Sequence, residues 1–198
     1  MIYLKANFTK RLCAFILDII FLSIIFSLVT FRFVNNANNF ENELDIVLEQ
    51  YENSEITVDE YNDKVFELNY ESQKSSFMSN MVNVVLYVGY FVIFGYLNNG
   101  KTLGKKICKI KVVDINGNVP SIWRMFVRSL FIYGLITLLF SVMFVYILNV
   151  KIFTIGFLIV TYIEIILMMI NFFMVLYRKD RRGLHDMIAK TNVIEEVK

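Results

Sequence analysis

Residues 12–34 read LCAFILDIIFLSIIFSLVTFRFV, an apolar stretch in which Asp18 and Arg32 are the charged side chains. A helix needs about 20 predominantly apolar residues to cross the hydrocarbon core of a bilayer, and this stretch is long enough. A cleaved signal peptide has a shorter apolar stretch and a small-residue cleavage site, and neither feature is present here. The sequence therefore predicts a retained transmembrane helix near the N-terminus.

Three further apolar stretches have the length of a membrane span, at about residues 77–97, 130–150 and 152–177. The chain has 198 residues, of which 57% are hydrophobic, whereas soluble domains are about 45–50% apolar. The short connection between the last two stretches predicts a tight helical hairpin. We therefore expect an all-α membrane protein, with one domain over residues 1–198 that forms a four-helix transmembrane bundle.

Charged residues are distributed unevenly among the segments that connect these spans. The loop 35–76 holds eleven acidic and two basic residues, whereas the loop 98–129 holds seven basic residues and one acidic residue. The tail 178–198 holds six basic and four acidic residues. Because cytoplasmic loops carry an excess of Lys and Arg, we expect a multi-pass protein of the cell membrane with both termini and loop 98–129 in the cytoplasm. The acidic loop 35–76 then lies outside.

Both loops contain signals for secondary structure. In the outer loop, residues 41–51 have apolar side chains at helical spacing, and Thr57 followed by Glu60 predicts a capping box at the start of a second helix. We expect a small helical extracytoplasmic cap, whose acids face water, attract cations or bind a partner. In the inner loop, residues 109–113 alternate basic and apolar, and Asn116–Gly117 predicts a tight turn. A short cytoplasmic β-hairpin-like loop is therefore expected.

The end of the inner loop predicts contact with the lipid bilayer. Ser121 follows Pro120 and is a candidate helix N-cap, and the next residues include Trp123, Arg124 and Arg128. Trp is enriched at membrane interfaces, and Arg binds anionic headgroups. We expect this segment to anchor the protein at the cytoplasmic surface of the membrane.

One motif has to be rejected. Residues 95–102 read GYLNNGKT and match the P-loop pattern G-x-x-x-x-G-K-[ST]. A P-loop needs a strand before it and a helix after it, so that backbone amides surround phosphate. Here an apolar span precedes the match and a strand-like segment follows it. We therefore expect no ATP binding.

No other chemical site can be recognised in the sequence. The chain has one His and two distant Cys, Cys13 and Cys108, which do not have the spacing of a metal site. No arrangement of nucleophile and base is evident. We expect no enzyme activity, no cofactor, no metal and no nucleic-acid partner.

Each predicted span contains polar side chains that lipid cannot satisfy. Asp18 lies in the first span, Asn83 in the second, and Glu164 and Asn171 in the fourth, roughly on one helical face. These groups either hold the helices together or form a polar path, in which Glu164, with Asn171 and Asn83, is an intramembrane protonatable site. Asp18 has candidate partners in Arg11 and the basic inner loop, whereas Glu164 has no evident basic partner in the spans.

Three ordered motifs resemble the RDD family of membrane proteins. They are KRLCAFILDII at residues 10–20, GKTLGKKICKIKVVDINGNVPS at 100–121 and DRRGLHDMIAKTNVI at 180–194. Together they extend over nearly the whole chain. The resemblance implies that the three signature residues of the family are, in order along this sequence, Arg11, Asp18 and Asp186.

The resemblance also implies that Gly100, Thr102, Gly104 and Lys105 form the cytoplasmic loop motif of the family. By the predicted topology, all three motifs lie at the cytoplasmic end of the bundle. We expect Asp186 and the loop 100–106 to bind each other there, together with Arg11. Strands around residues 111–113 and 192–194 are expected to pair beside them.

The functional expectation comes from this resemblance. The RDD family has no established general function, and transport, with cation/proton exchange in some members, has been suggested for it. We expect a protein that transports ions or small solutes, with cation/proton exchange as the most concrete version. The alternative is a non-transporting accessory or scaffold subunit that binds a protein partner through its outer cap or its basic inner face. In either case the chain could assemble as a homo-oligomer or with another membrane protein.

Overall fold

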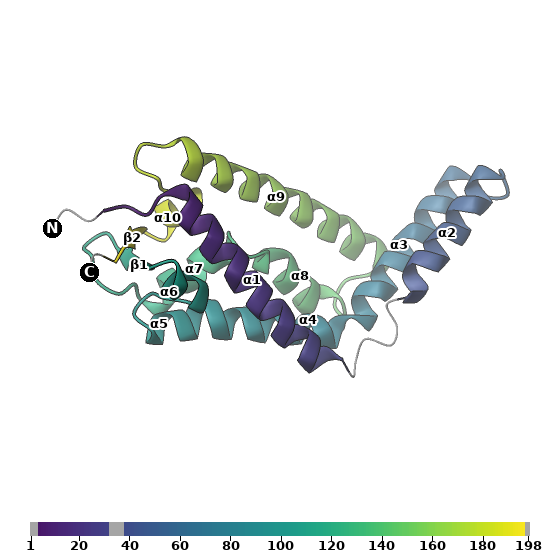
Figure 1. Cartoon of the computed structure of the whole chain (residues 1–198). Helices are drawn as coiled ribbons and strands as arrows, with labels where there is room; N and C mark the ends of the chain where they lie inside the picture. The colour runs from purple at the N-terminus through teal and green to yellow at the C-terminus, as the bar shows by residue number, and fades with distance from the viewer. Residues whose placement is uncertain (1–3, 32–37, 197–198) are drawn as a thin grey trace.

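The computed structural model describes residues 4–31 and 38–196 (Figure 1). Three helices in it are long and apolar enough to cross a membrane. The first is α1 (Phe8–Thr30) and the last is α9 (Val150–Tyr177). The middle one runs from Phe77 to Leu97 and consists of α4 (Phe77–Tyr87), the π-helical segment η1 (Val88–Phe94) and α5 (Gly95–Leu97).

The first span begins earlier than the sequence predicts. The side chain of Asn7 accepts a hydrogen bond of 2.9 Å from the backbone N–H of Lys10, which is the geometry of a helix N-cap. Arg11 therefore lies in the first turn of α1, on the same helix as Asp18. Residues 32–34, the predicted end of this span, lie outside the described residues.

The structure has no continuous helix over the predicted third span at about residues 130–150. Within it lies the shorter helix α8 (Leu135–Phe144), which follows α7 (Ile122–Leu130) at an angle of 89°, so that the two helices together could form at most one broken span. Gly134 at the bend has a φ of +72°, a conformation that is strained for residues with a side chain. The bundle therefore consists of three long helices and one broken pair.

The predicted helical cap consists of α2 (Asn38–Glu52) and α3 (Val58–Ser75), which form a hairpin that projects from the bundle (Figure 1). The predicted capping box is confirmed. The backbone N–H of Thr57 donates to Glu60 Oε2 at 2.8 Å, and the Thr57 hydroxyl accepts from the backbone N–H of Glu60 at 3.3 Å. After Ser76, the chain continues directly from α3 into α4.

A small sheet forms at the other end of the bundle, beside the short helices α6 (Leu103–Ile107) and α10 (Leu184–Ile188). Its strands β1 (Ile110–Asp114) and β2 (Thr191–Glu195) are antiparallel, with Val112 opposite Val193. The expected pairing of residues 111–113 with 192–194 is confirmed, whereas the β-hairpin within the inner loop is wrong because β1 pairs with the distant C-terminal strand. The N-terminal segment joins this end through a bridge between Lys5 and Ile194, so both ends of the chain lie opposite the α2–α3 hairpin (Figure 1).

Candidate functional site

Asp18 is fully buried and its carboxylate is held by groups from two other segments. One oxygen accepts hydrogen bonds from the Tyr90 hydroxyl at 2.6 Å and the backbone N–H of Gly104 at 2.7 Å. The other accepts from the Thr102 hydroxyl at 2.5 Å. The Tyr90 oxygen in turn accepts from the backbone N–H of Leu103 at 3.0 Å. Asp18 therefore fixes the loop motif against the first transmembrane helix.

This geometry explains why glycine occurs twice in the loop motif. Gly100 has a φ of +80°, and a side chain there would meet the backbone of Val112. A Cβ at position 104 would lie 2.8 Å from Asp18 Oδ1 and would also meet the carbonyl oxygen of Ala14. Only a residue without a side chain allows the backbone N–H of residue 104 to approach the carboxylate this closely.

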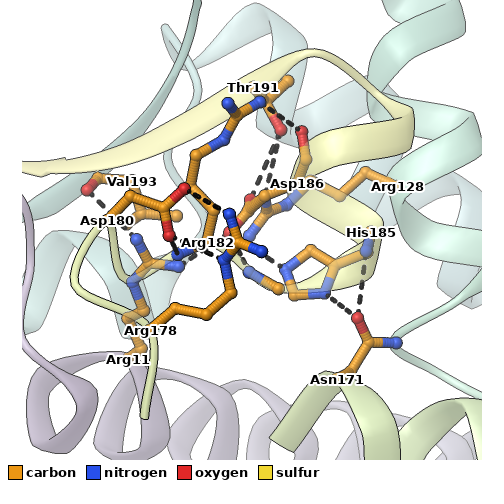
Figure 2. A network of polar contacts seen from close by, with 11 residues as sticks. Arg11, Arg128, Asn171, Arg178, Asp180, Arg182, His185, Asp186, Thr191 and Val193 are labelled. Atoms are coloured by element: carbon orange, nitrogen blue, oxygen red, sulfur yellow. Dashed lines mark hydrogen bonds and ion pairs between the residues drawn. The ribbon is translucent and has the colours of Figure 1, made fainter. Parts of the chain in front are cut away.

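Asp186 is the second fully buried carboxylate, and it lies at the centre of a polar network (Figure 2). Arg11 from α1 donates to its Oδ2 at 2.8 Å, and Arg128 from α7 forms an ion pair with its Oδ1. The backbone N–H of Gly183 and the hydroxyl of Thr191 also donate to it. Asp186 thereby joins α1, α7, α10 and β2.

These contacts decide among the expected partners. Arg11 binds Asp186, as expected, and not Asp18, its other candidate partner on the same helix. The expected contact between Asp186 and the loop motif is wrong, because the loop instead binds Asp18 through Thr102 and Gly104. The three motifs still converge at one end of the bundle, as expected.

Arg128 also differs from its prediction as a surface anchor. Only 6% of the residue is exposed, and its guanidinium is directed at Asp186. Arg124, one turn earlier, instead pairs with Asp114 at 3.3 Å, and Trp123 is exposed as a membrane anchor would be. The two positively charged groups of Arg11 and Arg128 balance the charge of the two buried carboxylates.

His185 and Asn171 extend the network to α9. The Asn171 side-chain oxygen lies 2.9 Å from the backbone nitrogen and 2.8 Å from Nδ1 of His185, and its Nδ2 donates to the carbonyl of Phe131. Burial lowers the pKa of His185, and the adjacent Arg128 also disfavours its protonation, although Asp186 favours it. Burial by itself would raise the pKa of Asp186, but the positive charge of Arg128, the interaction with His185 and the charge of Arg11 together hold this pKa well below its usual value.

A cavity of about 220 Å³ lies between the two carboxylate clusters. Its polar lining comes from Arg11, Asp18, Lys105, Arg128, Asn171 and His185, and the rest is apolar apart from Tyr133. The volume is below the roughly 300–1,000 Å³ of pockets for drug-sized ligands. The cavity thus suits a small group with a charged end.

Lys105 is the least satisfied charged residue of the cavity. It is 7% exposed, and among the described residues no hydrogen bond or ion pair involves its Nζ, which lies 5.8 Å from the centre of the Phe91 ring. Burial lowers the pKa of Lys105 to about 8, an effect that Asp18 opposes and Arg128 reinforces. Its amine therefore loses and gains a proton close to physiological pH.

The family model described as the RDD family matches residues 5–190, nearly the whole chain. The chain belongs to the RDD family. The matched range includes Arg11, Asp18 and Asp186, the three residues named by the sequence resemblance, and these lie in the two buried clusters. No curated protein and no solved structure matches this RDD protein.

The remaining predicted site residues lie elsewhere in the RDD protein. Glu164 is buried in α9, and its two oxygens accept hydrogen bonds of 3.0 Å from the backbone N–H groups of Ile136 and Thr137. It therefore caps the first turn of α8 and does not line the cavity. Asn83 is half-buried on α4 and also lies outside the cavity lining. The protonatable role of Glu164 stays a prediction.

Sequence reasoning missed Arg128 and Tyr90 as partners of the signature acids. Tyr90 lies within the second predicted span, and nothing near it in the sequence indicates that its partner is Asp18. For Arg128 a signal exists in the charge balance, because two buried carboxylates with only Arg11 beside them leave one negative charge uncompensated. A second buried cation could therefore have been sought among the basic residues of the neighbouring loop.

Proposed function

We propose that this RDD protein is a proton-linked transporter of small solutes and that the cavity between the two carboxylate clusters is its solute site. Three basic residues, two carboxylates and a His meet around or beneath this cavity, at one end of helices long enough to span a membrane. Such groups are costly in a membrane protein and are commonly found on substrate and proton pathways.

The extent of the cavity is the observation that carries this proposal. Its lining comes from α1, α6, β1, α7, the bend before α8, α9, α10 and β2. Among the described residues, none from α2, α3, α4 or α8 lines it. A site that is confined to one end of the bundle supports a carrier that alternates between two states, rather than an open channel.

Cation/proton exchange is the version that the family resemblance implies, and the geometry restricts how it could work. A cation at Asp18 would have to displace Tyr90, Thr102 and the Gly104 backbone, because these donors occupy both carboxylate oxygens. Lys105 offers a simpler proton link, since the pKa of its amine is lowered to about 8. Release of that proton would change the charge of the solute site by one unit.

The orientation belongs to the same proposal. The basic inner loop, the sheet and both ends of the chain would lie in the cytoplasm, and the acidic α2–α3 hairpin would lie outside the cell membrane. The distribution of positive charge supports this arrangement, and the cavity would then lie at the cytoplasmic end of the bundle.

The test is reconstitution of the purified protein into phospholipid vesicles that contain a trapped pH-sensitive dye. A pH gradient is imposed, and sodium, potassium or hexanesulfonate is added outside. We expect one of these solutes to dissipate the gradient at least several-fold faster than in protein-free vesicles. Asp18→Asn should abolish the effect, whereas Lys106→Met, at an exposed position next to Lys105, should keep it. If wild-type vesicles dissipated the gradient no faster than protein-free or Asp18→Asn vesicles with every solute, the proposal would be overturned.

The scaffold alternative is favoured by one observation. The α2–α3 hairpin projects beyond the bundle, and Ile46 and Val58 on it are more than half exposed (Figure 1). A hairpin of this kind could bind another membrane protein. Absence of any flux in vesicles, together with a partner that copurifies with the wild type but not with an Ile46→Glu/Val58→Glu variant, would support this function.

A further inference from the structure

Among the described residues, two donor groups of side chains that line the cavity have no acceptor. Lys105 is 7% exposed, and its Nζ donates no hydrogen bond there. Arg11 Nε is buried and likewise has no hydrogen-bond partner in the described part of the chain. Buried polar groups in folded proteins nearly always have partners, so donors without acceptors at a cavity indicate a missing acceptor.

The balance of charges around the cavity also indicates a missing negatively charged group. Arg11, Arg128 and Lys105 supply three positive charges when protonated, whereas Asp18 and Asp186 supply two negative charges. Both carboxylates are fully buried and already accept several hydrogen bonds each. The surplus is one positive charge, and a single negative charge in the cavity would balance it.

The mouth of the cavity is apolar. Leu12 on α1 and Phe172 on α9 line it and are 38% and 46% exposed. Beside them, the rings of Phe8 and Phe172 meet edge to face at 5.2 Å. Leu12 lies four residues from the start of α1 and Phe172 five residues from the end of α9, or roughly 6–8 Å at 1.5 Å per residue. With these helix ends at the membrane surface, this depth is where lipid headgroups give way to acyl chains.

We propose that the cavity binds an amphiphilic anion, with its negatively charged head at Lys105 and Arg11 and its hydrocarbon chain leaving between α1 and α9. The head is a carboxylate, sulfonate or phosphate, as in a fatty acid or an acidic phospholipid. This inference names the ligand class of the solute site proposed above and rests on that proposal only for the step of transport.

Charge and size exclude the obvious competitors. A cationic amphiphile would meet three positive side chains, and a neutral one would leave the surplus positive charge without a counter-charge. A nucleotide is too large for a cavity of about 220 Å³ and has no chain to occupy the apolar mouth. A small inorganic anion would satisfy the donors but would leave the apolar mouth unused.

Binding should also depend on pH through Lys105. Burial lowers the pKa of this amine to about 8, while Asp18, Asp186 and Arg128 act on it from α1, α10 and α7. Above that pH the amine is neutral and the surplus positive charge disappears. An ionised ligand should therefore bind more weakly at pH 9 than at pH 7.

The experiment measures binding of radiolabelled hexadecanesulfonate to the purified full chain in maltoside detergent, because a sulfonate stays ionised throughout this pH range. Unlabelled oleate, phosphatidylglycerol, phosphatidylcholine and hexadecyltrimethylammonium are added as competitors. We expect the two anionic competitors to displace the probe at concentrations at least ten-fold lower than the other two. The better of the anionic competitors then identifies the source of the head, a free fatty acid or a lipid headgroup.

Variants locate the binding site. Lys105→Met should weaken binding at least ten-fold at pH 7, Lys105→Arg should bind at pH 7 and also at pH 9, and the exposed neighbour Lys106→Met should behave as wild type. Because Lys105→Met could fail to fold, Leu12→Trp provides a second variant at the exposed mouth. It should narrow the opening and reduce binding without affecting the buried clusters.

Several outcomes would overturn the inference. Equal competition by hexadecyltrimethylammonium and oleate would show that the site does not select an anion. Unchanged binding in both Lys105→Met and Leu12→Trp would show that the probe binds elsewhere. The binding assay needs no gradient, so it is independent of transport. Binding without solute flux in vesicles would overturn the transport proposal but not the proposed ligand class. Solute flux without binding of the probe would overturn the ligand class but not the transport proposal.

Discussion

Arg11 and Asp186 lie 175 residues apart in the chain, yet Arg11 Nη1 is 2.8 Å from Asp186 Oδ2. Arg128 binds the other oxygen of the same carboxylate. The pair connects the start of the first transmembrane helix to the segment after the last one. It therefore closes one end of the bundle and sets the shape of the cavity.

We predict strong coupling between Arg11 and Asp186. Removing one partner of a buried ion pair leaves an uncompensated charge and typically costs about 3–5 kcal/mol. In Arg11→Met/Asp186→Asn, the loss should be smaller than the sum of the single losses by about 0.5–3 kcal/mol, because the second substitution removes a group that is already unpaired. The measurement is the free energy of unfolding of each variant in mixed detergent.

Lys101 provides the control for this cycle. Its Nζ pairs with Glu196 at 2.8 Å and does not belong to the Asp186 network. Lys101→Met and Asp186→Asn should therefore have additive effects, to within about 0.5 kcal/mol. Additive losses for the Arg11 pair as well would argue against the direct contact.

A second prediction concerns Gly104, whose backbone N–H donates to Asp18 at 2.7 Å. Gly104→Ala places a Cβ 2.8 Å from the carboxylate oxygen, so the loop must move away and lose this bond. Overpacking of this kind costs about 1–3 kcal/mol, and losing a hydrogen bond to a charged group adds about 1.5–3 kcal/mol. A clear fall in the thermal unfolding midpoint should follow.

Gly89, in the π-helical segment of the second span, is the matched control. No atom lies within 4 Å of a Cβ added there. Gly89→Ala should be neutral, or stabilising by up to about 1 kcal/mol, because alanine has less freedom to lose in a helix. If both alanine variants unfold at the wild-type temperature, the close approach at Gly104 is not needed.

Much of this architecture could be predicted from the sequence because it depends on local patterns. Apolar length located the spans, the pattern of Thr57 and Glu60 located the start of α3, and alternation in residues 109–113 located a strand. Each of these signals arises from neighbouring residues in the chain. The resemblance to the RDD family then identified the three signature residues.

The wrong or missed predictions concern contacts between residues that are distant in the sequence, and no local pattern reveals such contacts. Arg11 and Asp18 are seven residues apart, which places them on one helical face and suggested a pair. The structure instead supplies each with a stronger partner from a distant segment. The bend at Gly134 was also missed, because an apolar stretch of sufficient length predicts a span whether or not its backbone turns. Glu164, which caps the helix after that bend, lies 28 residues from Ile136.

A third prediction separates the two roles of Glu164. Glu164→Leu leaves the backbone N–H groups of Ile136 and Thr137 without an acceptor, at about 1–3 kcal/mol for each buried group. Glu164→Gln keeps one acceptor oxygen and should lose about half as much stability. Unfolding in mixed detergent measures both losses.

The same Glu164→Gln variant in vesicles tests its predicted protonatable role. Glutamine cannot exchange a proton, but it can still cap α8. Because Glu164 does not line the cavity, we expect proton flux close to that of the wild type. Flux that disappears while the protein stays folded would instead establish Glu164 as a proton site.

The last prediction is a dependence of stability on pH through His185. Burial is the main cause that lowers its pKa from the usual 6.5, so the folded protein binds fewer protons at this site than the unfolded chain just below that pH. Stability should therefore decrease as the pH falls below about 6.5, until the lower pKa of the folded state is reached. Asp186 acts in a separate range, because its pKa lies well below 3.8 and its stabilising charge is lost only at much lower pH. Unfolding midpoints of wild type and His185→Gln between pH 7.5 and 5 measure the effect; a decrease of the same size in both proteins would assign it to another group.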